Sequence, residues 1–128
     1  MRHTFIFPLK VPKSKSKNFI LNMNNYRNTH FQSLNAAKKN FKAMIADQLQ
    51  AAPRFKGKVR IEYKLFPATK RLCDLDNVMA VQKKFGQDAM VEFGVIEEDT
   101  YDILVSNKEE FGEIDRENPR VEATVISC

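Results

Sequence analysis

The sequence contains no long apolar run and few cysteines, and both shortages exclude classes of protein. No stretch approaches the roughly 18 apolar residues that a membrane-spanning helix requires. The apolar start around Phe5 and Phe7 is too short for a signal peptide, so we expect a cytoplasmic protein. Of the two cysteines, Cys73 adjoins an acidic motif and Cys128 is the last residue, and we expect no structural disulfide between them.

Acidic residues are nearly absent from the first 71 residues. Only Asp47 and Glu62 occur there, against 16 lysines and arginines, whereas the remaining residues hold 14 acids and 5 lysines and arginines. The two parts therefore carry formal charges of +14 and −9. The basic part suits a polyanion such as nucleic acid, which we favour over the alternative of an ordinary solvated lysine-rich surface. The acidic part fits such a protein if some of its acids hold a divalent cation.

Apolar periodicity predicts the regular elements of a single domain of 128 residues. Helical spacing marks Ser33–Ala51, with Ser33 as N-cap, and a second helix that follows residue 77 and ends near Phe93. Alternation predicts strands at residues 4–9, 58–66, 101–106 and 120–126. Residues 10–17 are turn-prone, and residues 21–28 suggest an ordered loop. We expect an α/β (α+β) fold with one mixed sheet of about four strands and two main helices, in the order β-α-β-α-β-β.

The motif Asp74-Leu75-Asp76-Asn77 stands where the second of these strands gives way to the second helix. In an extended segment, residues two apart point the same way, so Asp74 and Asp76 can share a cation. Magnesium prefers carboxylate oxygens together with waters and substrate phosphate. An aspartate at a helix N-terminus is also an ordinary cap, which explains one of the two carboxylates without any chemistry.

A second acidic cluster, Glu97-Glu98-Asp99, follows the same helix after Gly94. An exposed charged turn is the commonest reading of such a run. The cluster gains meaning only if the returning chain brings it beside Asp74 and Asp76. That convergence is a geometric expectation that the structure can test.

In order along the chain, these features resemble the RusA family of Holliday junction resolvases, found in bacteria and in many phages and prophages. The resemblance covers nearly the whole sequence. Its first part is an Asn-rich loop before a basic helix (Asn22, Asn24, Asn25, Tyr26 and Arg27). Its second part is Lys70-Arg71 leading into the Asp-Leu-Asp-Asn motif, followed by Gly94-Val95 and the acidic turn, and then by a final strand after Pro119.

The resemblance implies a magnesium-dependent endodeoxyribonuclease that resolves branched DNA in recombination and repair. The family's three essential acids fall on Asp74, Asp76 and Asp99, which would hold Mg²⁺, with Mn²⁺ as a substitute. The family's essential lysine, one helical turn after the second aspartate, falls on Ala80, where this sequence departs from the pattern. Lys83 and Lys84 lie about one turn further on, and the sequence leaves open which of them replaces it.

The resemblance also implies a homodimer, whose two-fold axis would suit a four-way junction. Basic residues in loops are expected to hold the DNA backbones: Lys13, Lys15, Lys17, Arg27, Lys70 and Arg71. A protein of the same fold that binds branched DNA without cutting it is the alternative, because the lysine has moved.

Overall fold

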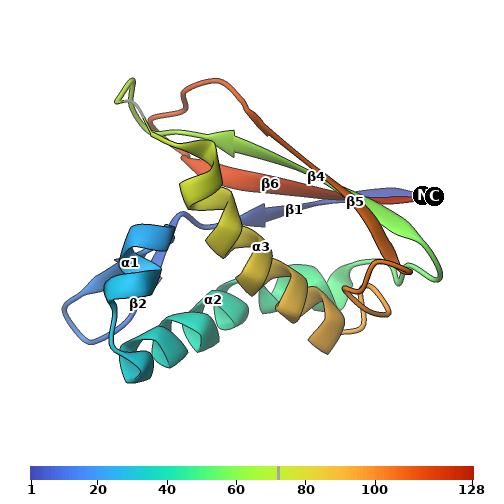
Figure 1. Ribbon diagram of the computed structural model, residues 1–128, viewed down its shortest axis with the longest axis horizontal. Coiled ribbons are helices and arrows are strands. Elements are labelled where there is room, and N and C mark those ends of the chain that lie inside the picture. Colours follow the sequence, from blue (N-terminus) through green and yellow to red (C-terminus); the bar gives the residue numbers. More distant parts are fainter. Residues whose placement is uncertain (72) are drawn as a thin grey trace.

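The computed structural model describes residues 1–71 and 73–128. It contains six strands and three helices (Figure 1). The strands are β1 (Arg2–Phe7), β2 (Lys10–Pro12), β3 (Asn18–Ile20), β4 (Val59–Phe66), β5 (Leu104–Phe111) and β6 (Arg120–Ser127). The helices are α1 (Met23–Asn28), α2 (Phe31–Ala51) and α3 (Leu75–Glu92).

Four of the strands form a mixed sheet in the order β1-β6-β4-β5. β6 is antiparallel to both β1 and β4, whereas β4 and β5 are parallel and are joined through α3. Parallel neighbours require such a crossover, since the chain has to return to the same edge of the sheet before it starts the second strand. The predicted α+β class, with one mixed sheet of four strands and two main helices, is confirmed.

One face of the sheet carries the core, and α2 and α3 cover it (Figure 1). The alternation in β4 decides which side chains point inward: Val59, Ile61, Tyr63 and Leu65 are buried, and the residues between them are half-buried on the opposite face. In α3, Gly86 allows close approach to β1, because a Cβ there would lie 2.5 Å from Cε2 of the Phe7 ring. The close packing of α3 on β1 thus depends on glycine, which has no side chain, at position 86.

Several element boundaries differ from the sequence-based prediction. Residues 10–20 form a β2–β3 hairpin, and most of the expected loop 21–28 is the short helix α1. Helix α2 begins two residues early, with His30 and not Ser33 as its N-cap. The strand predicted at residues 101–106 starts at Leu104 and extends to Phe111, because residues 101–103 form a turn. Met44 of α2 is 54% exposed, although it follows the helical spacing of the buried residues Phe41 and Ile45.

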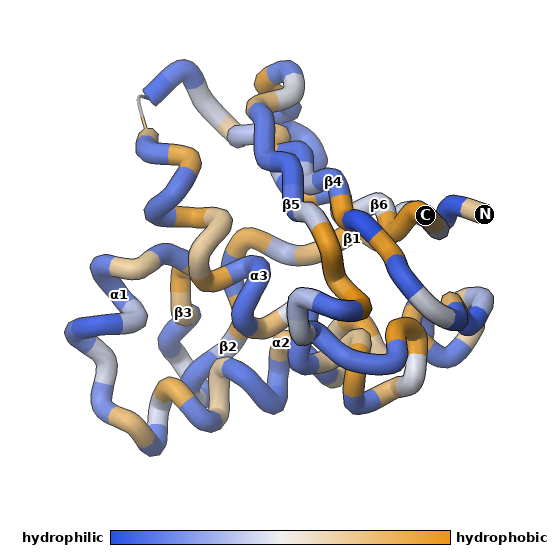
Figure 2. Tube along the Cα trace, turned by 45° about the vertical axis from the view of Figure 1, so that its right-hand side comes forward, coloured by the Kyte–Doolittle hydropathy of each residue, from blue (hydrophilic) through white to orange (hydrophobic). Residues whose placement is uncertain are grey.

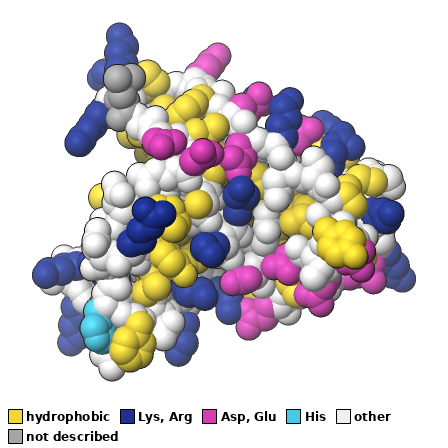
Figure 3. Space-filling model, in the orientation of Figure 1, with side chains coloured by type: hydrophobic (Ala, Val, Ile, Leu, Met, Phe, Trp, Pro, Cys, Tyr) yellow, Lys and Arg dark blue, Asp and Glu magenta, His cyan; other side chains and the backbone are white. Residues whose placement is uncertain are grey.

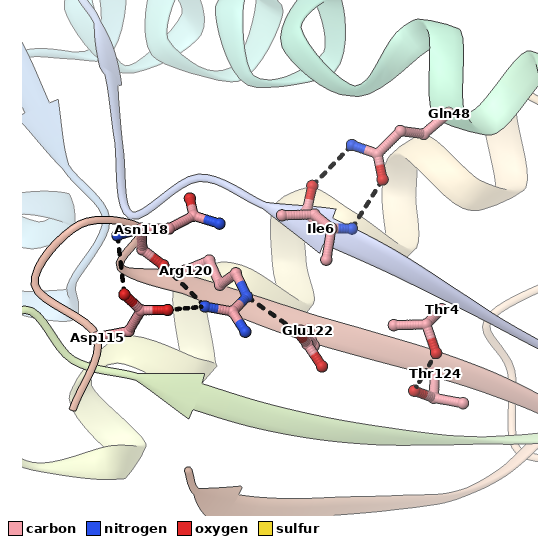
Figure 4. A network of polar contacts seen from close by, with 8 residues as sticks. All are labelled: Thr4, Ile6, Gln48, Asp115, Asn118, Arg120, Glu122 and Thr124. Carbon is pink, nitrogen blue, oxygen red and sulfur yellow. Dashed lines mark hydrogen bonds and ion pairs between the residues drawn. The ribbon is translucent and has the colours of Figure 1, made fainter. Parts of the chain in front are cut away.

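Polar contacts secure the ends of the sheet strands (Figure 4). Gln48 of α2 donates to the carbonyl of Ile6 at 2.8 Å and accepts from its N–H at 2.7 Å, which ties α2 to β1. At the start of β6, Arg120 donates to the carboxylates of Asp115 and Glu122 at 2.8 and 2.9 Å. The Asn118 N–H and the Arg120 guanidinium lower the pKa of Asp115. No helix in the described ranges is both long and apolar enough to cross a membrane.

Candidate metal and nucleic-acid site

The pair Asp74 and Asp76 lies at the N-terminal end of α3, where the chain has left the C-terminal end of β4. Asp74 is the N-cap of α3, and its carboxylate accepts the Asp76 N–H at 3.0 Å. The capping alternative therefore holds for Asp74. Asp76 lies in the first turn, is exposed, and pairs with no partner among the described residues. Both carboxylates are solvent-accessible, as cation ligands that also bind water and phosphate need to be.

These two acids line a hollow of about 450 Å³ with residues of α1, which we call the aspartate hollow. Its walls are Met23, Asn24, Arg27, Asp74, Asp76, Asn77 and Ala80. The hollow therefore combines two carboxylates from α3 with an arginine from α1. That combination can hold a cation and a phosphate side by side.

A second hollow of about 460 Å³, the lysine hollow, adjoins the first at Ala80. Its walls are Ala80, Lys83, Lys84, Gln87, Asp88, Asp99 and Asn107. Gln87 forms part of a polar network there, because its amide donates to the Tyr63 hydroxyl at 2.8 Å and to the Asn107 side-chain oxygen at 3.3 Å. Burial raises the pKa of the Tyr63 phenol well above its ordinary value, so this network stays neutral.

The two candidate lysines have different partners. Lys83 forms an ion pair with Glu109 of β5. The Lys84 ammonium lies over the ring of Tyr26 in α1, 5.8 Å from its centroid. Both line the lysine hollow, and neither is among the residues that line the aspartate hollow. Ala80 stands at the position where the family pattern has lysine, and it lines both hollows.

The structure brings Asp74 and Asp76 together but leaves Asp99 in the other hollow. Asp99 lies in the turn before β5, and parallel pairing puts this turn near the start of β4, where Gly57 donates to Glu97 and the Val59 N–H donates to the Ile103 carbonyl. Asp74 and Asp76 lie beyond the other end of β4. The 18-residue helix α3 connects the two regions, and Asp99 lines the lysine hollow together with Ala80, which lies about one helical turn after Asp76. Within residues 1–71 and 73–128, no three acidic, histidine or cysteine side chains form a metal-binding group.

The expected DNA-binding residues lie in three places. Lys13, Lys15 and Lys17 surround the turn of the β2–β3 hairpin, and Arg27 lines the aspartate hollow. Lys70 and Arg71 lie in the exposed loop before α3, and Arg71 also lines a neighbouring hollow that shares Asn24, Asp74 and Asn77 with the aspartate hollow. In Figure 3, acidic groups lie towards both ends of α3, with basic side chains between them.

Sequence reasoning missed the amide side chains that organise the two hollows. Asn77 accepts hydrogen bonds from α1, and Gln87 and Asn107 belong to the lysine hollow. Asn77 was visible as part of the Asp-Leu-Asp-Asn motif, but its acceptor role depends on the position of α1. Gln87 gave no signal, because a half-buried helical glutamine is common.

Comparison with known proteins adds no assignment to this geometry. No family model matches the chain, and no curated protein matches it either.

Proposed function

We propose that this chain is a magnesium-dependent endodeoxyribonuclease that cuts branched DNA, such as Holliday junctions, during recombination and repair. The observation that carries the proposal is the exposed pair Asp74 and Asp76 beside Arg27 in the aspartate hollow. Two carboxylates that line one hollow repel each other, and a bound cation would offset that repulsion. The family resemblance of the motif points in the same direction.

The donor set fits a hard divalent cation. Asp74 and Asp76 offer carboxylate oxygens, and their exposure leaves room for water and for a substrate phosphate. Mg²⁺, or Mn²⁺ in its place, would supply activation of water and charge stabilisation at the scissile phosphate when bound. Arg27 would hold a non-bridging phosphate oxygen from the opposite wall. The lysine hollow would offer Lys84, and less effectively the paired Lys83, to the adjoining strand. Asp99, the third expected metal ligand, would contribute its carboxylate from the lysine hollow.

Basic residues outside the hollows would hold the arms of the branched DNA. Lys13, Lys15 and Lys17 on the hairpin, with Lys70 and Arg71 before α3, would neutralise phosphates and carry no sequence information. A homodimer would present two aspartate hollows to opposed strands of a four-way junction.

A branched-DNA-binding protein without catalysis is the second candidate. It is favoured by alanine at position 80, by the pairing of Lys83 with Glu109, and by the position of Asp99 in the lysine hollow and not in the aspartate hollow. This candidate shares the basic surfaces of the first and differs only in the fate of the phosphodiester bond.

A synthetic four-way junction tests both candidates. The protein is incubated with the junction in Mg²⁺, in Mn²⁺ or in EDTA, alongside Asp76→Asn. We expect symmetric nicks from the unmodified protein with either metal, none in EDTA, and binding in all cases. Binding without nicks would select the second candidate, and equal cleavage by Asp76→Asn would refute the assigned carboxylates.

A further inference from the structure

Helix α1 has little of its own to hold it in place. It has six residues, none of them buried, and a helix this short is not stable in isolation. Figure 2 shows that α1 is mostly hydrophilic. Its position beside the aspartate hollow therefore has to come from contacts with other elements.

The first contact is a pair of hydrogen bonds to α3. The side-chain oxygen of Asn77 accepts the N–H groups of Met23 and Asn24, at 3.0 and 3.3 Å. The first N–H groups of any helix lack partners within the helix. Here the next one, of Asn25, is accepted by the N-cap Asn22 at 2.8 Å, and the N–H of Asn22 bonds to the Ile20 carbonyl. Asn77 thus satisfies the two donors that remain.

The second contact lies two helical turns further along α3. The centroid of the Tyr26 ring lies 6.4 Å from that of Phe85, and the Lys84 ammonium lies over the Tyr26 ring, 5.8 Å from its centroid. Asn77 and Lys84 are seven residues apart and so lie on one side of α3. Two attachments on one stripe fix both the position and the direction of α1 along α3.

We infer that Asn77 is a positioning residue: by holding the start of α1, it sets Arg27 and Asn24 across the aspartate hollow from Asp74 and Asp76. The consequence for DNA binding rests on the proposed function. The two hydrogen bonds from Met23 and Asn24 to Asn77, which we call the clamp, are a property of the fold. Asn77 touches neither the cation nor the DNA in this assignment. Its effect on DNA passes through Arg27.

A matched pair of variants separates the acceptor from the bulk of the side chain. Asn77→Leu removes the oxygen at similar size, whereas Asn77→Asp keeps an acceptor for both N–H groups and adds a charge that the helix N-terminus favours. Amide hydrogen exchange at Met23 and Asn24 is measured by NMR in each variant. We expect exchange to rise about tenfold or more in Asn77→Leu and to stay near the original rate in Asn77→Asp. Unchanged exchange in Asn77→Leu would overturn the clamp.

A double-mutant cycle with Arg27→Ala tests the link to the hollow. With four-way junction DNA as substrate, we expect Asn77→Leu and Arg27→Ala each to lower kcat/KM about tenfold, and the double variant to resemble Arg27→Ala alone. Losses that multiply would refute transmission through Arg27. If the unmodified protein neither binds nor cuts the junction, the proposed function fails, while the exchange measurement still decides the clamp.

Discussion

The aspartate hollow and the lysine hollow share Ala80, yet their charges are balanced in different ways. In the lysine hollow, Lys83 pairs with Glu109, and a neutral amide network connects Gln87, Tyr63 and Asn107. In the aspartate hollow, Asp76 has no ion pair among the described residues. In the lysine hollow, charge is therefore largely compensated within the protein. The aspartate hollow keeps negative charge available for an external cation.

The largest expected effect is a difference in DNA cleavage between variants of Asp76, in the aspartate hollow, and of Asp99, in the lysine hollow. Asp76→Asn should reduce junction cleavage in Mg²⁺ by more than about a hundredfold, because a charged ligand is lost from the assigned cation site. Asp99→Asn should cost less than about tenfold, since Asp99 lies in the other hollow. Single-turnover rates under identical conditions measure both. Equal losses would mean that the two hollows work as one site on bound DNA and that Asp99 is as important for catalysis as Asp76.

The next effect disturbs the helix that both hollows share. Gly86→Ala should lower the free energy of unfolding by about 1–3 kcal/mol, because the new methyl group overlaps the buried Phe7 ring. Helix propensity alone would favour alanine by about 1 kcal/mol, so a loss identifies the steric cause. Urea unfolding measures the change. Asp88→Ala, at an exposed position of α3, is the control and should be near neutral. A gain in stability at Gly86→Ala would contradict the close packing.

Alkaline pH should act on the lysine hollow through Tyr63. Its pKa is raised in the folded protein, so above pH about 10 the unfolded chain loses this proton first and stability falls as the pH rises. The contribution is about 1.4 kcal/mol per pH unit. Tyr63→Phe should remove that part of the slope, although it also removes the Gln87 hydrogen bond. Denaturant melts from pH 9 upward compare the two proteins, and parallel slopes would disprove the shift.

The smallest effect distinguishes the two lysines. Lys84→Met should reduce the slope of log Kd against log salt concentration by about 0.9, the value for one phosphate contact. Lys83→Met should leave the slope nearly unchanged, because Glu109 already neutralises that lysine. Binding to a four-way junction in EDTA supplies both slopes. The reverse order would show that the Lys83–Glu109 pair opens on DNA and that Lys83 is the functional residue.

The sequence was informative where local patterns decide the structure. Alternation in β4 and the apolar stripe of α3 predicted both elements, and Gly94, after the end of α3, adopts the positive φ of 73° that favours glycine there. It failed for α1, whose stability comes from Asn77 across 54 positions of sequence. The sequence also left open how Asp99 lies relative to Asp74 and Asp76, because it did not show that β5 pairs parallel to β4; in the structure, Asp99 lines the lysine hollow.

The two ends of the chain meet at one place in the sheet. The Ser127 N–H donates to the Met1 carbonyl at 2.9 Å, and both termini lie at the opposite side of the molecule from α1 (Figure 1). A short peptide joining them would give a circularly permuted protein, which could be opened at the hairpin turn around Ser14 without breaking a sheet strand. A fluorophore or surface tether attached at either end would likewise leave the aspartate hollow accessible to large substrates.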